Sequence, residues 1–598
     1  MIFCLGAAFP QGQNTESSHQ ETPGLMVIRV QVRGGLQPDE DIFRGLDVVR
    51  YHRDSGELEM VTTRREYEAL LAQGYQVEVT VWDSKKELLS RLQWRPSKNG
   101  LVPAPAIADL AYFRSYDEVV EMIHDMQANH PDLVKVDSIG HSHEGHAIWL
   151  VKIAENVRVD DPTKAGVYYD GLHHAREHIS PEIVLYFMNY LLTEYAAGNP
   201  RVVNILANRQ LWFIPIVNPD GHKHSFNVEP LWRKNRRDNG DGTFGVDLNR
   251  NYPYLWGYDD IGSSPLTSAF DYRGPNPASE PEVQAILNFF EGPGSENRKI
   301  AIALSYHASG NYWLLPWGYT LSKAPDFHII KALGDSAATY NGYAVGSWPE
   351  LLRYQGNGSA LDYLYHDGET KARIFSMTPE VGPEFIPDIS LIPQLVGENL
   401  GPNLFMAEYA DLIGRLGPIT TTSANQYMAP GSDSVVVTAA FTDPENLAVN
   451  ANINSVDSTQ LNTMILYNDG SHNDGETGDS LFGNAWAVPE GEYYYNVGVE
   501  VSVAAGDTIT FGMTEFPGFT TQGPVVYGSY SLTGPDTLPQ AGDRIYFFLG
   551  LTNEGNSATV RGVSAVISSS DTCIAAITRA EAPYGDIAAG ATVVGGGS

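Results

Sequence analysis

Three side chains in the middle of the sequence have the types and spacing of metal ligands. His174 and Glu177 lie three residues apart, directly after the apolar segment GVYYDG, and His307 ends another apolar segment, IAIALSYH. Two imidazoles and one carboxylate that leave a fourth position open are a typical donor set of a catalytic zinc ion. The H-x-x-E pair alone would be weak evidence. With His307, and with both segments predicted to be strands, the ligands fall where an open α/β sheet places its site.

The segments around these residues resemble the zinc carboxypeptidase family, and in particular its bacterial carboxypeptidase T-like branch. The resemblance extends over roughly residues 112–416, about half of the chain. Its motifs, in family order, are GLHHARE, NPDG, WRKNR, GVDLNRNY, YRGPNPASEPE, SYHASGNYWLLPWG, YQGNGSALDY and TPEVG. It implies a mixed, mainly eight-stranded sheet with helices on both faces, and an enzyme that hydrolyses the C-terminal peptide bond of peptides and proteins.

The resemblance also implies catalytic roles, residue by residue. His174, Glu177 and His307 match the ligands of one Zn²⁺ ion, which lowers the pKa of bound water to about 7 and polarises a carbonyl. Glu380 matches the glutamate that takes the proton of that water and passes it to the leaving amine. Arg236, in WRKNR, matches the arginine that stabilises the oxyanion beside the metal.

Four further positions are implied to bind the substrate. Asn249 and Arg250 match the pair that grips the terminal carboxylate, for which a guanidinium offers a planar fork of donors. This pair distinguishes an exopeptidase from a zinc endopeptidase. Tyr354 matches the mobile tyrosine that closes over the bound residue, and Arg176 matches an additional subsite arginine.

Leu361 falls where the family sets its preference for the terminal residue. An apolar side chain at this position predicts apolar or aromatic C-terminal residues rather than lysine or arginine. Asp362 is the next residue, so an error of one in the register would reverse this prediction.

The pattern of elements predicts several units along the chain. Short apolar strands alternate with helices over residues 106–416, which predicts an α/β catalytic domain with both faces of its sheet covered. Residues 26–83 predict a small α+β unit, which we interpret as a pro-segment, with a permanent N-terminal domain as the alternative. Residues 84–105 are a predicted linker, and residues 1–25 are predicted to be disordered or the remnant of a secretory signal.

The last third of the chain has a different sequence pattern, in which apolar and polar residues alternate with a period of two, as in SVVVTAAF. It predicts a β-sandwich module over residues 417–533 and a second β-rich module over 534–598, for which truncation is one interpretation. From residue 417 onward there are 19 acidic residues and only three basic ones, which suits an extracellular module, with cation binding as one interpretation and a plain acidic soluble surface as the alternative. A cell surface or a glycan is the candidate partner of these β modules. In the loop of residues 468–480, three aspartates are a candidate structural Ca²⁺ site, with a glycine-rich hairpin as the favoured alternative.

Composition excludes some classes of partner. A net charge of −34 disfavours nucleic acid and anionic membranes, and no apolar run is long enough to span a membrane. Cys4 and Cys573 stand at opposite ends and are not expected to pair. We expect a secreted or extracellular protein, with the periplasm or cell surface as variants. The oligomeric state is left open.

One histidine-rich segment is predicted to have no role in metal binding. HSHEGH, residues 141–146, resembles a metal cluster, but the family turn that it matches carries other polar residues, so a solvated turn is favoured.

Two competing hypotheses concern the function. In a surface-binding protein with an inactive hydrolase domain, a ligand or the glutamate is usually lost, whereas here all are present. A zinc amidase or endopeptidase that acts on cell-wall peptides is disfavoured by the Asn249–Arg250 pair.

Overall fold

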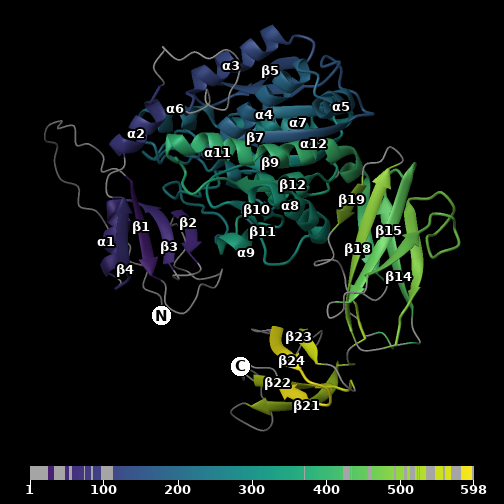
Figure 1. Cartoon of the computed structure of the whole chain (residues 1–598). Coiled ribbons are helices and arrows are strands. Elements are labelled where there is room, and N and C mark those ends of the chain that lie inside the picture. Colours follow the sequence, from purple (N-terminus) through teal and green to yellow (C-terminus); the bar gives the residue numbers. More distant parts are fainter. Residues whose placement is uncertain are drawn as a thin grey trace, which may run out of the picture.

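The computed structural model shows a central domain with further units on its flanks (Figure 1). It describes residues 25–31, 47–52, 57–72, 74–81, 85–95, 112–368, 371–421, 428, 431, 434–455, 461–490, 493–503, 508–511, 519–521, 523, 525–533, 546–555, 559–566 and 581–594. The disordered or signal-like stretch predicted at the N-terminus lies outside these residues, except for its last position.

The central sheet has eight strands in the order β11-β10-β12-β9-β7-β8-β6-β5. The four middle strands, from β12 to β8, run parallel to one another, whereas β6 is antiparallel to β8 and to β5, and β10 is antiparallel to β12. The predicted mixed eight-stranded sheet is therefore confirmed. Its strands are β5 Val134–His141, β6 Ala147–Ile153, β7 Ala165–Gly171, β8 Arg209–Ile214, β9 Ile300–Tyr306, β10 Tyr312–Leu315, β11 Ala344–Ser347 and β12 Phe375–Glu380.

Helices cover both faces of this sheet, because the middle strands are apolar on both sides. In β7, Val167 and Tyr169 belong to one core with α3, α4, α8 and α12, whereas Tyr168 belongs to a second core with α7 and α10. The predicted capping box forms at the start of α3, between Ser115 and Glu118. The helices are α3 Tyr116–Asn129, α4 Ile179–Ala196, α5 Pro200–Asn208, α6 Pro219–Asn227, α7 Pro281–Glu291, α8 Phe327–Asn341, α9 Trp348–Leu352, α10 Ala360–Tyr365, α11 Ile392–Glu398 and α12 Leu400–Arg415.

A four-stranded antiparallel sheet forms the N-terminal unit, in the order β2-β3-β1-β4. Alternating residues of β1 are buried against α1, as the sequence pattern predicted. The next helix, α2, is attached to the central domain: Leu92 is fully buried, and the guanidinium of Arg91 donates to the carbonyl of Ile386 at 3.0 Å. The elements are β1 Met26–Gln31, β2 Asp47–His52, β3 Glu57–Thr62, α1 Arg64–Ala72, β4 Gln76–Val81 and α2 Lys85–Gln93.

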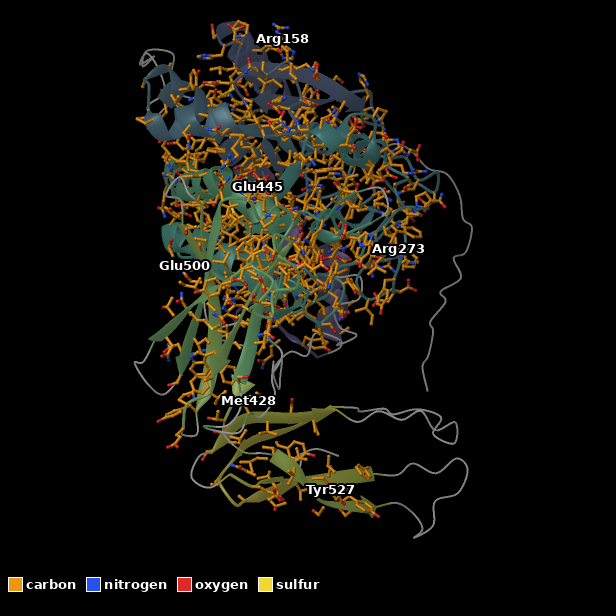
Figure 2. The ribbon with its side chains drawn as sticks, turned by 90° about the vertical axis from the view of Figure 1, so that its right-hand side faces the viewer. Arg158, Arg273, Met428, Glu445, Glu500 and Tyr527 are labelled. Carbon is orange, nitrogen blue, oxygen red and sulfur yellow. The ribbon has the colours of Figure 1, made fainter. Side chains whose placement is uncertain are left out.

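Strands dominate the C-terminal part. One sheet has the order β13-β14-β17 and another β16-β15-β18-β19, and their buried residues lie in one apolar cluster. Figure 2 shows Glu445 and Glu500 on this part and Tyr527 on the smaller sheets that follow. The strands are β13 Leu416–Thr421, β14 Ser434–Phe441, β15 Leu447–Ser455, β16 Leu461–Leu466, β17 Leu481–Ala487, β18 Tyr494–Val503, β19 Thr508–Phe511, β20 Phe519–Thr520, β21 Val525–Thr533, β22 Tyr546–Asn553, β23 Val560–Val566, β24 Glu581–Ile587 and β25 Thr592–Val594.

Within the described residues, no helix combines the length and the apolar character needed to cross a membrane.

Candidate active site

Two neighbouring parallel strands bring the three predicted ligands together. His174 follows the end of β7, Glu177 precedes α4, and His307 follows the end of β9. The Nδ1 atom of His174 is 2.8 Å from Glu177 Oε1, and the Nδ1 atom of His307 is 2.9 Å from Glu177 Oε2. All three side chains are buried. One donor atom from each of the three residues lies within 4.8 Å of the other two, so a single ion can contact all three.

The chemistry of this cluster fits a zinc ion. The two Nδ1 atoms of His174 and His307 face each other at 3.1 Å, an arrangement that suits two lone pairs directed at one cation. Burial lowers the pKa of His174 and so favours the neutral imidazole, the form that binds metal. Burial would raise the pKa of Glu177, but the two imidazoles hold it well below its usual range, so the carboxylate is charged.

Asp247 orients one of the ligands. Its Oδ1 lies 3.2 Å from Nε2 of His174, which leaves Nδ1 of that imidazole free for the ion, as carboxylates next to metal-binding histidines commonly do. The other oxygen, Oδ2, accepts two bonds from Arg233, at 2.8 and 3.0 Å. Burial opposes the charge of Asp247, but Arg233 and His174 hold its pKa well below the usual range. Sequence reasoning did not single out this aspartate.

Glu380 lies beside the cluster, at the end of β12. Its backbone pairs with that of His307: the N–H of His307 donates to the carbonyl of Pro379, and the N–H of Val381 donates to the carbonyl of His307, both at 2.9 Å. Burial and the negative charge of Glu177 raise the pKa of Glu380. A partly buried carboxyl with a raised pKa beside a metal site is suited to proton transfer.

The structure corrects the predicted position of one arginine. Arg233, not Arg236, lines the cleft at the metal cluster. The guanidinium of Arg236 lies 4.8 Å from the ring of Trp232 and 4.7 Å from the ring of Phe244, and its nearest acidic group is Glu144 at 3.9 Å. WRKNR contains two arginines three residues apart in irregular backbone, and the sequence does not reveal which one turns towards the ligands.

Asn249 and Arg250 lie next to the cluster but not equally close to it. Asn249 lines the cleft, and its Oδ1 is fixed by the N–H of Ala360 at 2.8 Å. The guanidinium of Arg250 lies 5.1 Å from the ring of Trp348, which itself lines the cleft. Tyr354 also lines the cleft, and burial raises its pKa to about 12.

Leu361 and Asp362 have clearly different surroundings. Leu361 is buried in an apolar cluster with Leu314, Trp348 and Leu352. The carboxylate of Asp362 is buried as well, and it accepts the backbone N–H groups of two consecutive residues, 318 and 319, at 2.8 and 3.1 Å. Asp362 is therefore engaged by backbone, and the side chain that belongs to the apolar cluster is Leu361.

Arg176 reaches the cleft but is paired with the N-terminal unit. Its two terminal nitrogens bind both carboxylate oxygens of Asp47, at the start of β2, with Nη2 and Oδ1 at 2.7 Å. Both side chains are almost fully buried, with 1% and 4% exposed. The Arg176 guanidinium also lies 4.0 Å from the ring of Phe385. Sequence reasoning missed Asp47, because nothing in its own segment indicates a partner 129 residues away.

The acidic loop of residues 468–480 directs its carboxylates at its own backbone. Asp474 accepts the N–H groups of residues 469, 470 and 472, and Asp479 accepts those of residues 476 and 481. Asp469 pairs with His472 at 2.9 Å. In the described part of the chain, the groups of three ligand atoms close enough for a metal ion lie elsewhere, so the candidate Ca²⁺ site is not supported.

Known proteins share this sequence pattern. The profile of the zinc carboxypeptidase family matches residues 119–400. A zinc carboxypeptidase from Saccharothrix mutabilis subsp. capreolus is 29% identical over 433 residues, which cover 69% of this chain and 95% of that protein. Carboxypeptidase B from Astacus astacus is 29% identical over 44% of this chain and 85% of its own length. For human carboxypeptidase A6, with 30% identity, the match covers 44% of this chain and only 60% of the relative.

Two solved structures share the fold. Carboxypeptidase A from Helicoverpa armigera has a TM-score of 0.55 at 23% identity, with 66% of this chain and 99% of that chain covered. Thrombin activatable fibrinolysis inhibitor has a TM-score of 0.53 at 22% identity, with 65% and 98% covered. At these identities, the likeness establishes the fold.

Proposed function

Since the chain belongs to the zinc carboxypeptidase family through residues 119–400 and is a metallocarboxypeptidase, we propose that it removes apolar or aromatic residues from the C-termini of peptides and proteins. We further propose that its N-terminal unit holds it inactive. The observation that carries the proposal is the composition of the cleft. The carboxyl group of Glu380, two arginines and the amide of Asn249 line the same cleft as the metal ligands His174 and Glu177.

Each residue of the cleft is assigned a separate role in the reaction. Zinc bound by the three ligands would supply a water with a pKa of about 7 and a polarised carbonyl. Glu380 takes the proton of that water and passes it to the leaving amine. Arg233 stabilises the oxyanion, because Asp247 fixes its guanidinium beside His174. Arg233 replaces Arg236 in this role.

The free carboxylate of the substrate needs polar donors at the end of the cleft. We assign this contact to Asn249, which lines the cleft, and to Arg250, whose guanidinium lies 5.1 Å from the ring of Trp348 in the cleft lining. The Nε atom of Arg250 is buried and has no hydrogen-bond partner, so the side chain retains a donor for a ligand. An enzyme that requires these contacts is an exopeptidase.

The preference for an apolar terminal residue is supported by the surroundings of Leu361. Trp348 and Leu352 belong to its apolar cluster and also line the cleft. The neighbouring carboxylate, Asp362, would select lysine or arginine only if it were free, and it is occupied by two backbone N–H groups.

Control by the N-terminal unit is supported by the Asp47–Arg176 pair and by the size of the cleft. The cavity next to the metal ligands has a volume of about 20 Å³, which is room for about one water molecule. A substrate residue can enter only after rearrangement, and release of Asp47 would free the subsite arginine. A permanent N-terminal domain remains the alternative to a removable pro-segment.

We also propose that the protein acts outside the cytoplasm or at the cell surface, and that its acidic C-terminal part binds a cell surface or a glycan. The support is the strong excess of acidic over basic residues in that part. Fractionation of producing cells would test the location.

A series of peptides that differ only in the last residue tests the proposed reaction. We expect release of free leucine or phenylalanine well above release of lysine. A chelator should abolish the activity, and zinc should restore it. C-terminally amidated versions of the same peptides should be resistant, because the amide lacks the charge that Asn249 and Arg250 would bind. Equal cleavage of free and amidated peptides would contradict the exopeptidase assignment.

The two arginines of WRKNR form a matched pair of variants. Arg233→Ala should lower kcat by about 10²–10³-fold, as loss of an oxyanion donor does. Arg236→Ala should leave kcat within about twofold, because that side chain packs on Trp232 and Phe244 away from the cleft. The reverse order would restore the assignment made from the sequence.

A further inference from the structure

The histidine-rich turn between β5 and β6 faces two buried glutamates at the start of α7. Nε2 of His143 lies 2.8 Å from Oε2 of Glu280, the residue that precedes the first turn of α7. Glu282, two residues later, completes a group whose ligand atoms all lie within 4.8 Å of one another. His143 is partly exposed, whereas both glutamates are fully buried. This group shares no residue with the cleft described above.

One atom of this group has no partner. Oε1 of Glu282 is buried and makes no hydrogen bond, and Oε2 accepts only a long bond of 3.3 Å from the amide of Asn235. A buried carboxylate oxygen without a donor is costly. By contrast, both oxygens of Glu280 are bonded: Oε1 accepts from Arg237 at 3.0 Å and from Ser279 at 2.7 Å, and Oε2 accepts from Asn235 at 2.8 Å.

The charges around Glu282 are also unbalanced. Burial raises its pKa, and the negative charges of Glu280 and Asp220 raise it further, against the opposing effect of His143. Asp220 does not complete the site as a ligand, because its oxygens accept from Ser142, His146 and the N–H of Glu144. The region thus holds three buried carboxyl groups, with Arg237 as the arginine bonded directly to one of them.

We propose that His143, Glu280 and Glu282 bind a second divalent transition-metal ion, of which Zn²⁺ is the representative, separate from the catalytic ion. One imidazole and two carboxylates form a nitrogen- and oxygen-donor set that Zn²⁺ accepts readily. The ion supplies the missing partner of Glu282 Oε1 and compensates the buried negative charge. The N–H groups of Asn235 and Arg237 and the hydroxyl of Ser279 donate to the carboxylates and hold them in place, as the surroundings of a metal site normally do.

The position of this site indicates a structural role. Asn235 lies two residues after Arg233 and connects this segment to the site, because its amide nitrogen donates to both glutamates. Its Oδ1 accepts the N–H of Val246 at 2.8 Å. An ion there ties the β5–β6 turn and the start of α7 to the base of that segment. The proposal departs from the solvated turn that the sequence predicted for HSHEGH.

The experiment counts metal ions in protein whose catalytic site is disabled. In a His174→Ala/His307→Ala background, metal-free protein is dialysed against micromolar Zn²⁺, and bound zinc is measured by mass spectrometry. We expect one zinc ion per chain, and none after His143→Ala is added. His141→Ala is the matched control, since His141 lies in the same segment but outside the group, and it should retain the ion. No bound zinc in the background, or equal binding in the His143 and His141 variants, would overturn the proposal.

A second variant covers the possibility that His143→Ala disturbs folding. Glu282→Gln keeps the size of the side chain and removes its charge. If Glu282 simply stays protonated and the group binds no metal, zinc should bind neither protein at this site and should not alter the melting temperature of either. We expect zinc to raise the melting temperature of the background protein and to raise it much less in Glu282→Gln, with zinc affinity at least about tenfold weaker. Equal shifts in both proteins would refute the site.

Discussion

The N-terminal unit contacts the central sheet at the carboxyl ends of its parallel strands, and the C-terminal sheets contact it at the amino ends. Asp47 of the N-terminal unit binds Arg176, five residues past the end of β7, at the carboxyl ends of the parallel strands. The C-terminal sheets approach the amino ends of the same strands. Asp443 lies in a groove together with the first residues of β7, β9 and β12, and Arg415 at the end of α12 donates to its backbone carbonyl at 2.8 Å. In Figure 1 the two appendages accordingly lie on different sides of the domain.

This difference indicates which appendage can control the enzyme. The metal ligands and Glu380 all lie at or just after the carboxyl ends of strands. Only an appendage that contacts these ends can therefore occupy a substrate subsite. Contacts at the amino ends can add stability but have no direct access to the cleft. The following predictions test this distinction.

Release of the N-terminal unit should have the largest effect. A specific protease site inserted between Val81 and Lys85 would free β1–β4 and leave α2 attached through the buried Leu92. Cleavage lets Asp47 dissociate from Arg176, and breaking a buried ion pair costs about 3–5 kcal/mol. The substrate no longer has to displace Asp47, so we expect kcat/KM to rise about 10²–10³-fold after cleavage. The measurement is hydrolysis of one peptide before and after cleavage.

Two controls accompany this experiment. Glu380→Gln in the same chain should show almost no activity before or after cleavage, because the proton acceptor is lost. Unchanged kcat/KM of the parent after complete cleavage would show that the unit is a permanent, non-inhibitory domain.

Asp47→Asn in the uncleaved chain should have an intermediate effect. The amide keeps the shape of the side chain but not its charge, so Arg176 is held less firmly and we expect kcat/KM to rise about tenfold. Glu59→Gln is the matched control, since Glu59 pairs with Arg29 inside the N-terminal unit and should leave kcat/KM unaffected. If both variants behave alike, the contact with Arg176 is not what closes the cleft.

Arg415→Ala should have the smallest effect on activity. The guanidinium donates to the carbonyls of Asp443 and Glu445, so its removal should lower the free energy of unfolding by about 1–3 kcal/mol. We expect kcat/KM to stay within about twofold of the parent. Thermal unfolding and peptide hydrolysis of the same preparation give both values; a large loss of turnover with intact folding would contradict the separation between the amino and carboxyl ends of the strands.

The sequence predicted the sheet well because its signals are local. Apolar strands and helices alternate clearly, and the capping box at Ser115 and Glu118 marks the start of a helix. The metal ligands were accessible for a related reason: His174 and His307 each follow a predicted strand, and parallel strands bring their ends together.

The remaining features depend on contacts between distant segments. Arg233 and Arg236 are equivalent in the sequence, and only the position of Asp247 distinguishes them. Asp47 lies in another unit, so its pairing with Arg176 has no local signal. The sequence predicted a solvated turn for His143, and no local signal indicates its contact with Glu280, which lies more than a hundred residues further along the chain.

Asp247 joins two parts of the cleft through a single carboxylate. One oxygen meets the ring of His174 and the other meets the guanidinium of Arg233. If the segment that carries Asp247 fluctuates, the side chains of His174 and Arg233 move with it in the same direction. The distance between the His174 ring and the Arg233 guanidinium is thereby preserved during thermal motion. If each side chain were bound by a different carboxylate, this distance would vary more.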